Sequence, residues 1–126
     1  MRIGVWQIKS EANIKPIQNH VAAWESENGI PGIIVATVEK FSTFLLPEEL
    51  VSTYNIPADP SWLQRNYTHC LYLIFADETS RKAYDTHPKH LALSDLLIPA
   101  LENGMDSILS FDVTLPKFWH KKLCRQ

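Results

Sequence analysis

The stretch YTHCLYLIFADETSRKAYDTHPKH, residues 67–90, decides the fold of this chain. Residues 68–75 alternate in the manner of a strand and give the strongest strand signal in the sequence. An aspartate in the N-cap position predicts that a helix follows over residues 78–86. Pro88 forces His87 out of helical geometry and starts a new helix at its own first position. The stretch therefore predicts a strand followed by two helices with a break between them.

The elements on either side complete a known pattern. Residues 3–8, 33–44 and 107–113 are predicted to form three more strands. A helix between the first two strands is indicated by apolar residues at helical spacing, which are Ile14, Ile17, Val21 and Trp24. The order strand, helix, strand, strand, broken helix, strand is the split βαβ pattern of ferredoxin-like folds. We therefore expect an α+β fold with a four-stranded antiparallel sheet in each chain.

The helix that begins at Pro88 is expected to bury a broad face of leucines. Pro99 should kink this helix, and Gly104 should end it. We expect one domain over residues 1–113, followed by a basic tail over residues 114–126.

A long connection over residues 45–66 separates the second and third strands. Connections of this length are usually functional or mobile. Two interpretations remain open. The connection is either a lid that roofs a pocket or a surface helix packed on the sheet. The apolar residues that would form the roof are Leu45, Leu46, Leu50, Tyr54 and Trp62.

Composition sets the broad class of the protein. The chain has 126 residues, 45% of them hydrophobic and 21% charged, which is typical of a single globular domain. A net charge of −2 gives no field that would attract nucleic acid. No membrane span or apolar leader is evident. We expect a cytoplasmic protein with reduced thiols at Cys70 and Cys124, stabilised by pairing with a second copy.

Several motifs resemble those of the stress-responsive A/B barrel (Dabb) family, and the likeness covers residues 67–113. These motifs are Tyr67-Thr68-His69, Phe75, Tyr84-x-x-His87-Pro88-x-His90 and Ile108-x-x-Phe111-Asp112. The resemblance implies a homodimeric α+β barrel with a pocket between each sheet and its helices. The family includes a polyketide cyclase that works by aldol condensation, a hydroxynitrile lyase and stress proteins without established chemistry.

The resemblance also implies roles for three residues. His90 would be the general base, Tyr84 its hydrogen-bond partner or an oxyanion donor, and His69 a donor in the pocket. These residue types suit aldol chemistry, because imidazole titrates near neutrality and a phenol is a neutral donor. The cyclase has a further histidine on its first strand, where this chain offers Arg2, Val5 or Gln7 instead.

Six further residues are predicted to bind substrate. Each candidate also has a structural interpretation, in which His87 caps a helix, Tyr84 packs in the core, and His69 and His90 are satisfied core histidines. The predicted binding residues are His87, Leu71, Leu73, Trp62, Tyr54 and His20.

Metal and cofactor chemistry have less support in the sequence. His87, His90 and His69 would reach one ion only if the helix were continuous, and Pro88 breaks it. The chain has no glycine-rich phosphate loop, and neither cysteine lies in a motif that activates a thiolate. We therefore expect no metal and no cofactor.

The sequence thus favours a cofactor-independent enzyme that acts on a hydrophobic small molecule, with aldol cyclisation or dehydration as the leading reaction. A hydroxynitrile lyase-type reaction is the second enzymatic possibility, with protonated His69 or Lys89 as the cation that stabilises cyanide. The opposing class is a non-enzymatic stress-responsive or ligand-binding protein.

Overall fold

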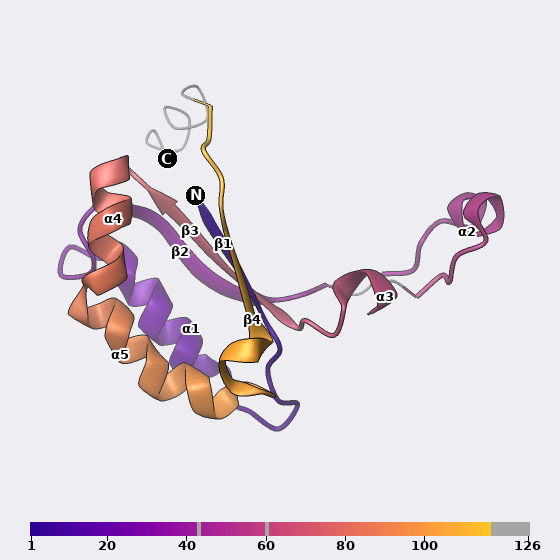
Figure 1. The fold of residues 1–126 in the computed structure, drawn as a ribbon, viewed down its shortest axis with the longest axis horizontal. Helices are drawn as coiled ribbons and strands as arrows, with labels where there is room; N and C mark the ends of the chain where they lie inside the picture. Colours follow the sequence, from indigo (N-terminus) through magenta and orange to yellow (C-terminus); the bar gives the residue numbers. More distant parts are fainter. Residues whose placement is uncertain (43, 60, 117–126) are drawn as a thin grey trace.

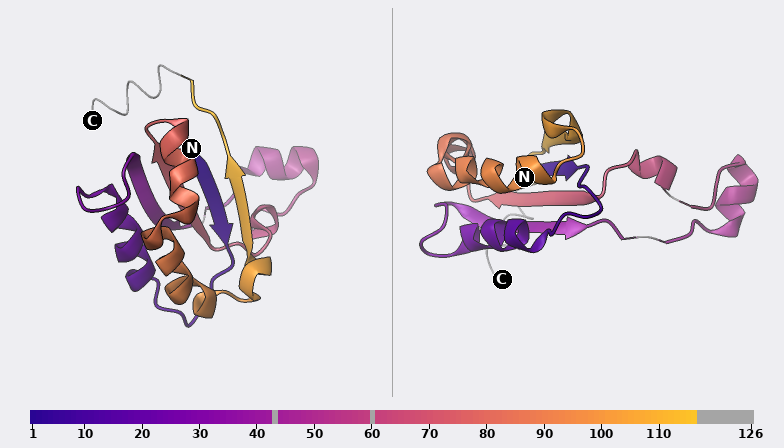
Figure 2. Two further views of the ribbon diagram at one scale, coloured as in Figure 1. Left: turned by 60° about the vertical axis from the view of Figure 1, so that its left-hand side comes forward. Right: turned by 90° about the horizontal axis from the view of Figure 1, so that it is seen from below.

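The computed structural model describes residues 1–42, 44–59 and 61–116. Its centre is an antiparallel four-stranded sheet in the order β2-β3-β1-β4. The helices pack on one face of this sheet (Figures 1 and 2). The architecture is the ferredoxin-like α+β fold that the sequence predicts. The strands are β1 (Arg2–Trp6), β2 (Ile33–Lys40), β3 (His69–Phe75) and β4 (Ile108–Asp112).

Three α-helices cover the sheet, namely α1 (Lys15–Ala22), α4 (Glu78–Thr86) and α5 (Pro88–Leu97). Short 3₁₀ turns extend α1 over Ala23–Glu25 and α5 over Ile98–Ala100, and a third spans Gly104–Ser107. The expected aspartate N-cap of α4 is confirmed, because the Asp77 carboxylate accepts a bond from the Ser80 N–H at 2.7 Å. Pro16 lies in the first turn of α1, where its missing N–H costs no helix bond.

Several predicted boundaries are wrong. The second strand ends at Lys40 rather than at residue 44, because the chain leaves the sheet for the long connection. Pro99 lies in a 3₁₀ turn after α5 and does not kink the helix. Gly104 does not end α5 but begins the next 3₁₀ turn, with a φ of 55° that glycine adopts without strain. The basic tail lies outside the described residues from Lys117 onward.

The hydrophobic core fills the space between the sheet and the helices. Alternate residues of β3 point into it, so Leu71, Leu73 and Phe75 are buried. Trp24, in the turn after α1, and Tyr84, in α4, are among the most deeply buried side chains. No helix within the described ranges is long and apolar enough to cross a membrane. The cytoplasmic location stays a prediction.

None of the helices in the described part of the chain covers the opposite face of the sheet (Figure 2). It carries the side chains that alternate with the core residues, including Ile3, Val5 and Tyr72. On β4, Leu109 and Phe111 are directed to the same face and are largely exposed, Phe111 at 53%. One face of the sheet is therefore largely apolar, and no helix among the described residues covers it.

The connection between β2 and β3 forms an arm that projects from one end of the sheet (Figures 1 and 2). We use the name arm for residues 44–59 and 61–66. It contains the short helices α2 (Glu48–Tyr54) and α3 (Ser61–Gln64), and neither has a buried residue. Within one chain the arm neither roofs a pocket nor packs on the sheet, so both sequence-based interpretations of this segment require correction.

Candidate functional site

The site centres on two rings that the break between α4 and α5 brings together. Tyr84 lies in the last turns of α4, and His90 is the third residue of α5. Their rings are stacked, with centroids 4.0 Å apart and planes inclined by 24°. His87 is extended at the break, and this turns the chain so that the imidazole of His90 lies against the phenol of Tyr84. The sequence motif thus produces the juxtaposition that the acid–base hypothesis requires.

The hydrogen bond of His90 defines its neutral tautomer. Nδ1 lies 3.1 Å from the backbone carbonyl oxygen of Asp85. A carbonyl oxygen only accepts, so Nδ1 carries the proton and donates it to this oxygen. In the neutral ring Nε2 then holds a lone pair, the form that a general base requires. Because the side chain is only half-buried, the ring keeps access to the surface.

Tyr84 is in the form of a neutral donor. Its side chain is 1% exposed, and burial, as the main cause, raises the pKa of the phenol well above its usual value. The hydroxyl forms no hydrogen bond with any residue of the described ranges. Tyr84 is therefore a protonated phenol whose donor is not used by the fold.

Trp24 fills the space behind the pair. Its indole meets three rings edge-on, with centroid distances of 5.5 Å to Tyr84, 6.2 Å to His90 and 5.7 Å to His20. Nε1 of Trp24 is buried and has no hydrogen-bond partner among the described residues. This ring makes the interior side of the site aromatic and tightly packed. The sequence indicated Trp24 only as part of an apolar helix stripe.

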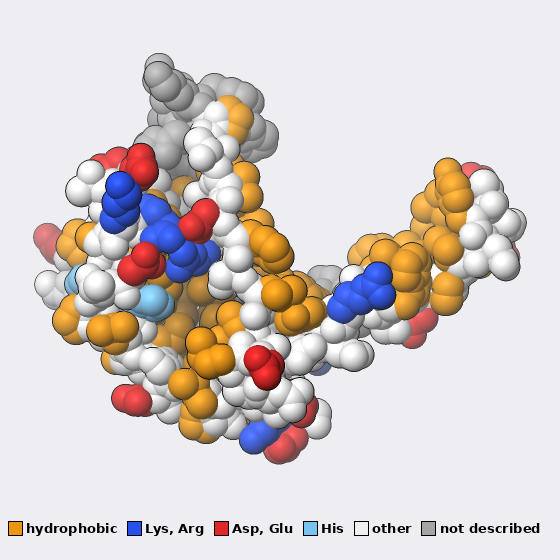
Figure 3. Space-filling model, in the orientation of Figure 1, with side chains coloured by type: hydrophobic (Ala, Val, Ile, Leu, Met, Phe, Trp, Pro, Cys, Tyr) orange, Lys and Arg blue, Asp and Glu red, His pale blue; other side chains and the backbone are white. Residues whose placement is uncertain are grey.

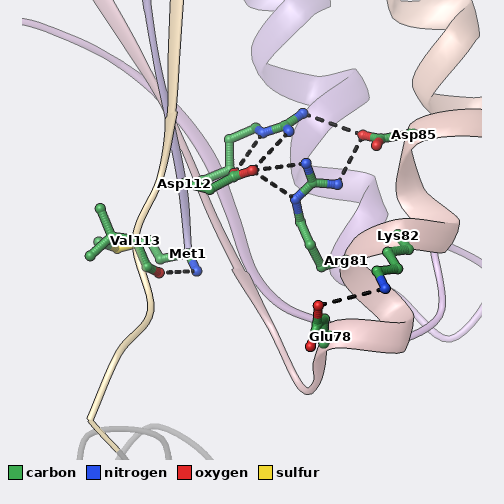
Figure 4. A network of polar contacts seen from close by, with 8 residues as sticks. Met1, Glu78, Arg81, Lys82, Asp85, Asp112 and Val113 are labelled. Atoms are coloured by element: carbon green, nitrogen blue, oxygen red, sulfur yellow. Dashed lines mark hydrogen bonds and ion pairs between the residues drawn. The ribbon is translucent and has the colours of Figure 1, made fainter.

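Two arginines and two aspartates form a cluster of ion pairs (Figure 4). Arg2 Nε is 3.0 Å from Asp112 Oδ1, and Arg81 Nη2 is 2.8 Å from Asp112 Oδ2. Arg81 also pairs with Asp85 at 3.0 Å, and Arg2 reaches the same carboxylate at 3.5 Å. Hydrogen bonds from both arginines lower the pKa of Asp112 to about 2.

Arg2 connects this cluster to the ring pair. Its Cζ atom lies over the Tyr84 ring, 5.7 Å from the centroid, which is within cation–π range. Asp85 also connects the arginine cluster to the ring pair. Its carboxylate pairs with the arginines, and its backbone carbonyl accepts a hydrogen bond from His90. Sequence analysis noted Arg2 only where a histidine was absent and did not predict this cluster.

A cavity of about 660 Å³ opens beside the cluster, between the start of α4 and the end of β4. Its apolar lining includes Ile74 and Phe75, and its charged lining includes Arg81, Asp85 and Asp112. Tyr84 and His90 do not line this cavity, although Phe75 contacts Tyr84 at 5.4 Å between ring centroids. Figure 3 shows the charged side chains on a face that is hollowed between the helices and β4.

His69 lies away from the pair. It is the first residue of β3, whereas the contact with Tyr84 comes from Phe75 at the other end of that strand. Six residues of strand separate the two positions by about 20 Å. His69 Nδ1 instead lies 2.7 Å from the Thr68 hydroxyl, which accepts a bond from the Ile8 N–H. The structure thus does not bring His69 together with Tyr84 and His90.

The predicted binding histidines have local partners. The ring of His87 accepts a bond from the Lys89 N–H at 3.1 Å and so caps α5. Nε2 of His20 lies 2.9 Å from the Lys89 carbonyl oxygen, which joins α1 to α5. His20 also borders Trp24, so it lies at the rim of the aromatic group.

The predicted apolar binding residues are divided between the core and the arm. Leu71 and Leu73 are buried in the core cluster and face the helices. Tyr54 and Trp62 lie on the exposed arm, at a distance from the ring pair within the same chain (Figure 1). The described ranges bring no three His, Cys, Asp or Glu side chains together as a metal site.

Comparisons with known proteins agree with this architecture. The family described as Stress responsive A/B Barrel Domain (Dabb) matches residues 51–115, just over half of the chain. A comparison with curated proteins finds no match.

Three solved structures show the same fold at low sequence identity. An Arabidopsis thaliana protein has 15% identity and a TM-score of 0.60, with 91% of this chain and 95% of that one covered. A Jannaschia protein, described as dimeric, ferredoxin-like and of unknown function, has 17% identity and a TM-score of 0.57, with 90% and 96% covered. Hydroxynitrile lyase from Passiflora edulis has 18% identity and a TM-score of 0.52, with 91% and 94% covered.

The ferredoxin-like architecture and a family match that begins in α2 and ends after β4 lead to the same assignment. This chain belongs to the stress-responsive A/B barrel domain (Dabb) family.

Proposed function

We propose that the protein is a cofactor-independent lyase or cyclase that acts on a hydrophobic small molecule through His90 and Tyr84. One observation carries this proposal: the rings of His90 and Tyr84 are stacked with centroids 4.0 Å apart, and neither His90 Nε2 nor the Tyr84 hydroxyl is bonded to a residue of the described ranges.

The leading reaction is proton abstraction next to a carbonyl, followed by aldol closure. Nε2 of His90 takes the proton from carbon, and the hydroxyl of Tyr84 donates to the enolate oxygen. The enolate carbon forms a bond to a second carbonyl carbon of the same molecule. The imidazolium returns its proton to the alkoxide that results, so the base is regenerated. Loss of water from this product would give the dehydrated ring.

Hydroxynitrile lyase-type cleavage is the second candidate, and the position of Arg2 favours it. Nε2 of His90 would take the hydroxyl proton of a cyanohydrin. The oxygen would then form the carbonyl as the bond to the nitrile carbon breaks, and cyanide would leave with the electron pair of that bond. The imidazolium would return its proton to cyanide, which releases hydrogen cyanide and regenerates the base. The cation required for cyanide is present in Arg2, at 5.7 Å from the Tyr84 centroid. The cations expected from sequence are not near, because His69 lies at the far end of β3 and Lys89 bonds to the Asn28 carbonyl.

A non-enzymatic role is the competing class, and the depth at which Tyr84 is packed supports it. Two variants, His90→Gln and Tyr84→Phe, separate the classes. Deuterium exchange at the α-carbon of aryl methyl ketones would report enolate formation, and release of benzaldehyde from mandelonitrile would report cleavage. The proposal expects folded variants that lose at least one of these activities about 10²-fold or more.

Absence of both activities in the wild type, together with loss of stability in both variants, would support the structural role instead. His20→Gln is the matched control. It also alters a histidine at the aromatic group, but not one of the stacked pair, and is expected to change turnover little.

The second element of the proposal is a homodimer formed through the open sheet face. The apolar side chains of that face, including Ile3, Val5 and Phe111, are not covered by any helix of the described residues, and Phe111 is 53% exposed. Two such faces stack about 10 Å apart in sheet-on-sheet packing. Two of the solved structures with this fold are described as dimeric. Sedimentation of the wild type and of Phe111→Lys tests this, and the variant is expected to be monomeric.

A further inference from the structure

The arm leaves an unusual amount of apolar side chain in contact with solvent. Leu45 is 74% exposed, Tyr54 67% and Phe44 63%. Leu50, Trp62 and Leu63 are also exposed, so six large apolar residues are gathered within twenty positions of the chain. Exposed apolar patches of this density mark a binding surface more often than a free loop. Figure 3 shows them as the orange part of the projecting arm.

The apolar residues of α2 form one stripe. Leu50, Val51 and Tyr54 follow at i, i+1 and i+4 and so share one side of the helix, while Glu48 and Ser52 occupy the other. This is the pattern of a helix that packs against another surface. Yet none of its residues is buried, so the described residues of its own chain do not supply a surface against which it packs.

The short length of the arm helices supports the same conclusion. Isolated helices shorter than about 12–15 residues are marginal in water, because nucleation is costly and few hydrogen bonds repay it. α2 has 7 residues and α3 has 4. The arm is held together by a bond from the Leu46 N–H to the Ala58 carbonyl at 2.9 Å. Its helices therefore need packing contacts from outside the chain to persist.

We propose that the arm is a clasp that binds a second copy of this chain, with the apolar stripe of α2 lying against the flank of the partner's sheet. This inference rests on the proposed pairing through the open sheet face. The arm continues the β2–β3 hairpin, because the Phe41 N–H donates to the Thr68 carbonyl at 2.8 Å just before it begins. It therefore extends beyond the end of the sheet, where a sheet stacked on the open face would lie within reach.

Two-fold symmetry defines the partner to which the arm binds. In a two-fold pair each chain supplies one arm and receives one, so two apolar stripes are covered at once. The edge strand β4 presents Leu109 and Phe111, and Val113 follows directly after it. All three are exposed, and they continue the apolar sheet face to its border. A second copy thus offers apolar surface both to the sheet face and to the arm. The clasp accounts for both exposed regions with one partner.

The test compares the dimer dissociation constants of full-length variants by sedimentation. Leu50→Ser/Tyr54→Ser removes the stripe, and Glu49→Ala/Ser52→Ala alters the same helix outside it. Because α2 has no buried residue, neither pair of substitutions is expected to disturb the fold of one chain. The clasp predicts that the stripe variant dissociates at least tenfold more readily, while the control remains within about twofold of the wild type, since it removes no buried apolar surface.

Phe111→Lys separates failure of the clasp from failure of the pairing itself. A stripe variant with the wild-type dissociation constant, alongside a monomeric Phe111→Lys, would overturn the clasp and leave the sheet-face dimer intact. A wild type that is monomeric at all concentrations would overturn both. Hydrogen exchange gives a second measurement: amides of residues 50–54 should be protected in the wild-type dimer and exchange rapidly in the Phe111→Lys monomer. Equal rapid exchange in the two would contradict the clasp.

Discussion

The imidazole of His90 lies against the ring of Tyr84, with centroids 4.0 Å apart, and its Nδ1–H is bound to the Asp85 carbonyl. The polar side-chain atoms of the two residues therefore have different roles. Nδ1 is used by the fold, whereas the phenol hydroxyl has no partner in the described part of the chain. Packing and chemistry can therefore be tested separately at Tyr84.

Tyr84→Phe is expected to leave stability almost unchanged, within about 0.5 kcal/mol, because the substitution removes only a hydroxyl that makes no hydrogen bond. Tyr84→Ala, in contrast, should cost about 3–5 kcal/mol, since it empties a fully buried aromatic position. Urea unfolding measures both values. A large loss in the Phe variant would show that the hydroxyl has a structural partner and would weaken the catalytic proposal.

His87 is expected to act through the helix end rather than through the substrate. Its ring accepts the Lys89 N–H at the start of α5, so His87→Ala should cost about 1 kcal/mol, which is typical for loss of an N-cap. His87→Asn should restore stability because its side-chain oxygen accepts the same bond. Thermal unfolding of both variants checks the effect. If the Asn variant is no more stable than the Ala variant, the cap does not account for His87.

The helix break is the part of the site that local sequence determines. Pro88 fixes an extended His87, and this alone brings positions 84 and 90 onto one side of the junction. The succession of strands and helices along the chain and the Asp77 cap follow from equally local chemistry. These features were predictable because each depends on residues only a few positions apart.

The contacts that were missed join distant parts of the chain. Arg2, Arg81 and Asp112 meet only because β1 pairs with β4 under α4, and no local pattern indicates that register. The separation of His69 from the ring pair was accessible in principle, since strand rise places the two ends of β3 far apart. The projection of the arm could not be predicted from the sequence, because its apolar residues fit a lid as well as a clasp.

His69 should make stability depend on pH near neutrality. Burial, with a smaller effect of Lys40, lowers the pKa of its imidazole below the usual 6.5. The unfolded chain therefore binds a proton that the folded chain resists, and stability should fall as pH drops through about 6.5 toward the folded pKa.

Urea unfolding at pH 7.5 and 5.5 should show this loss in the wild type. His69→Gln should lose less stability between these pH values. Lys40→Met should also lose less stability than the wild type, because one cause of the lowered pKa of His69 is removed. The same difference between the two pH values in all three proteins would contradict the assignment to His69.

Asp112 should hold β4 to α4 down to strongly acidic pH. Its pKa is lowered from 3.8 to about 2 by hydrogen bonds from Arg2 and Arg81, so its contribution is fully present above pH 3.8 and is lost as pH falls through 2. The carboxylate is half-exposed, and solvent screening limits the contribution to about 1 kcal/mol. Asp112→Asn should lose this amount at pH 7 and approach the wild type near pH 2.

Asp95→Asn, at an exposed α5 position, is the control and should change little. Salt should also narrow the difference between Asp112→Asn and the wild type, since exposed ion pairs are screened. A difference between the two that persists unchanged at pH 2 would show that the arginine cluster is not its cause.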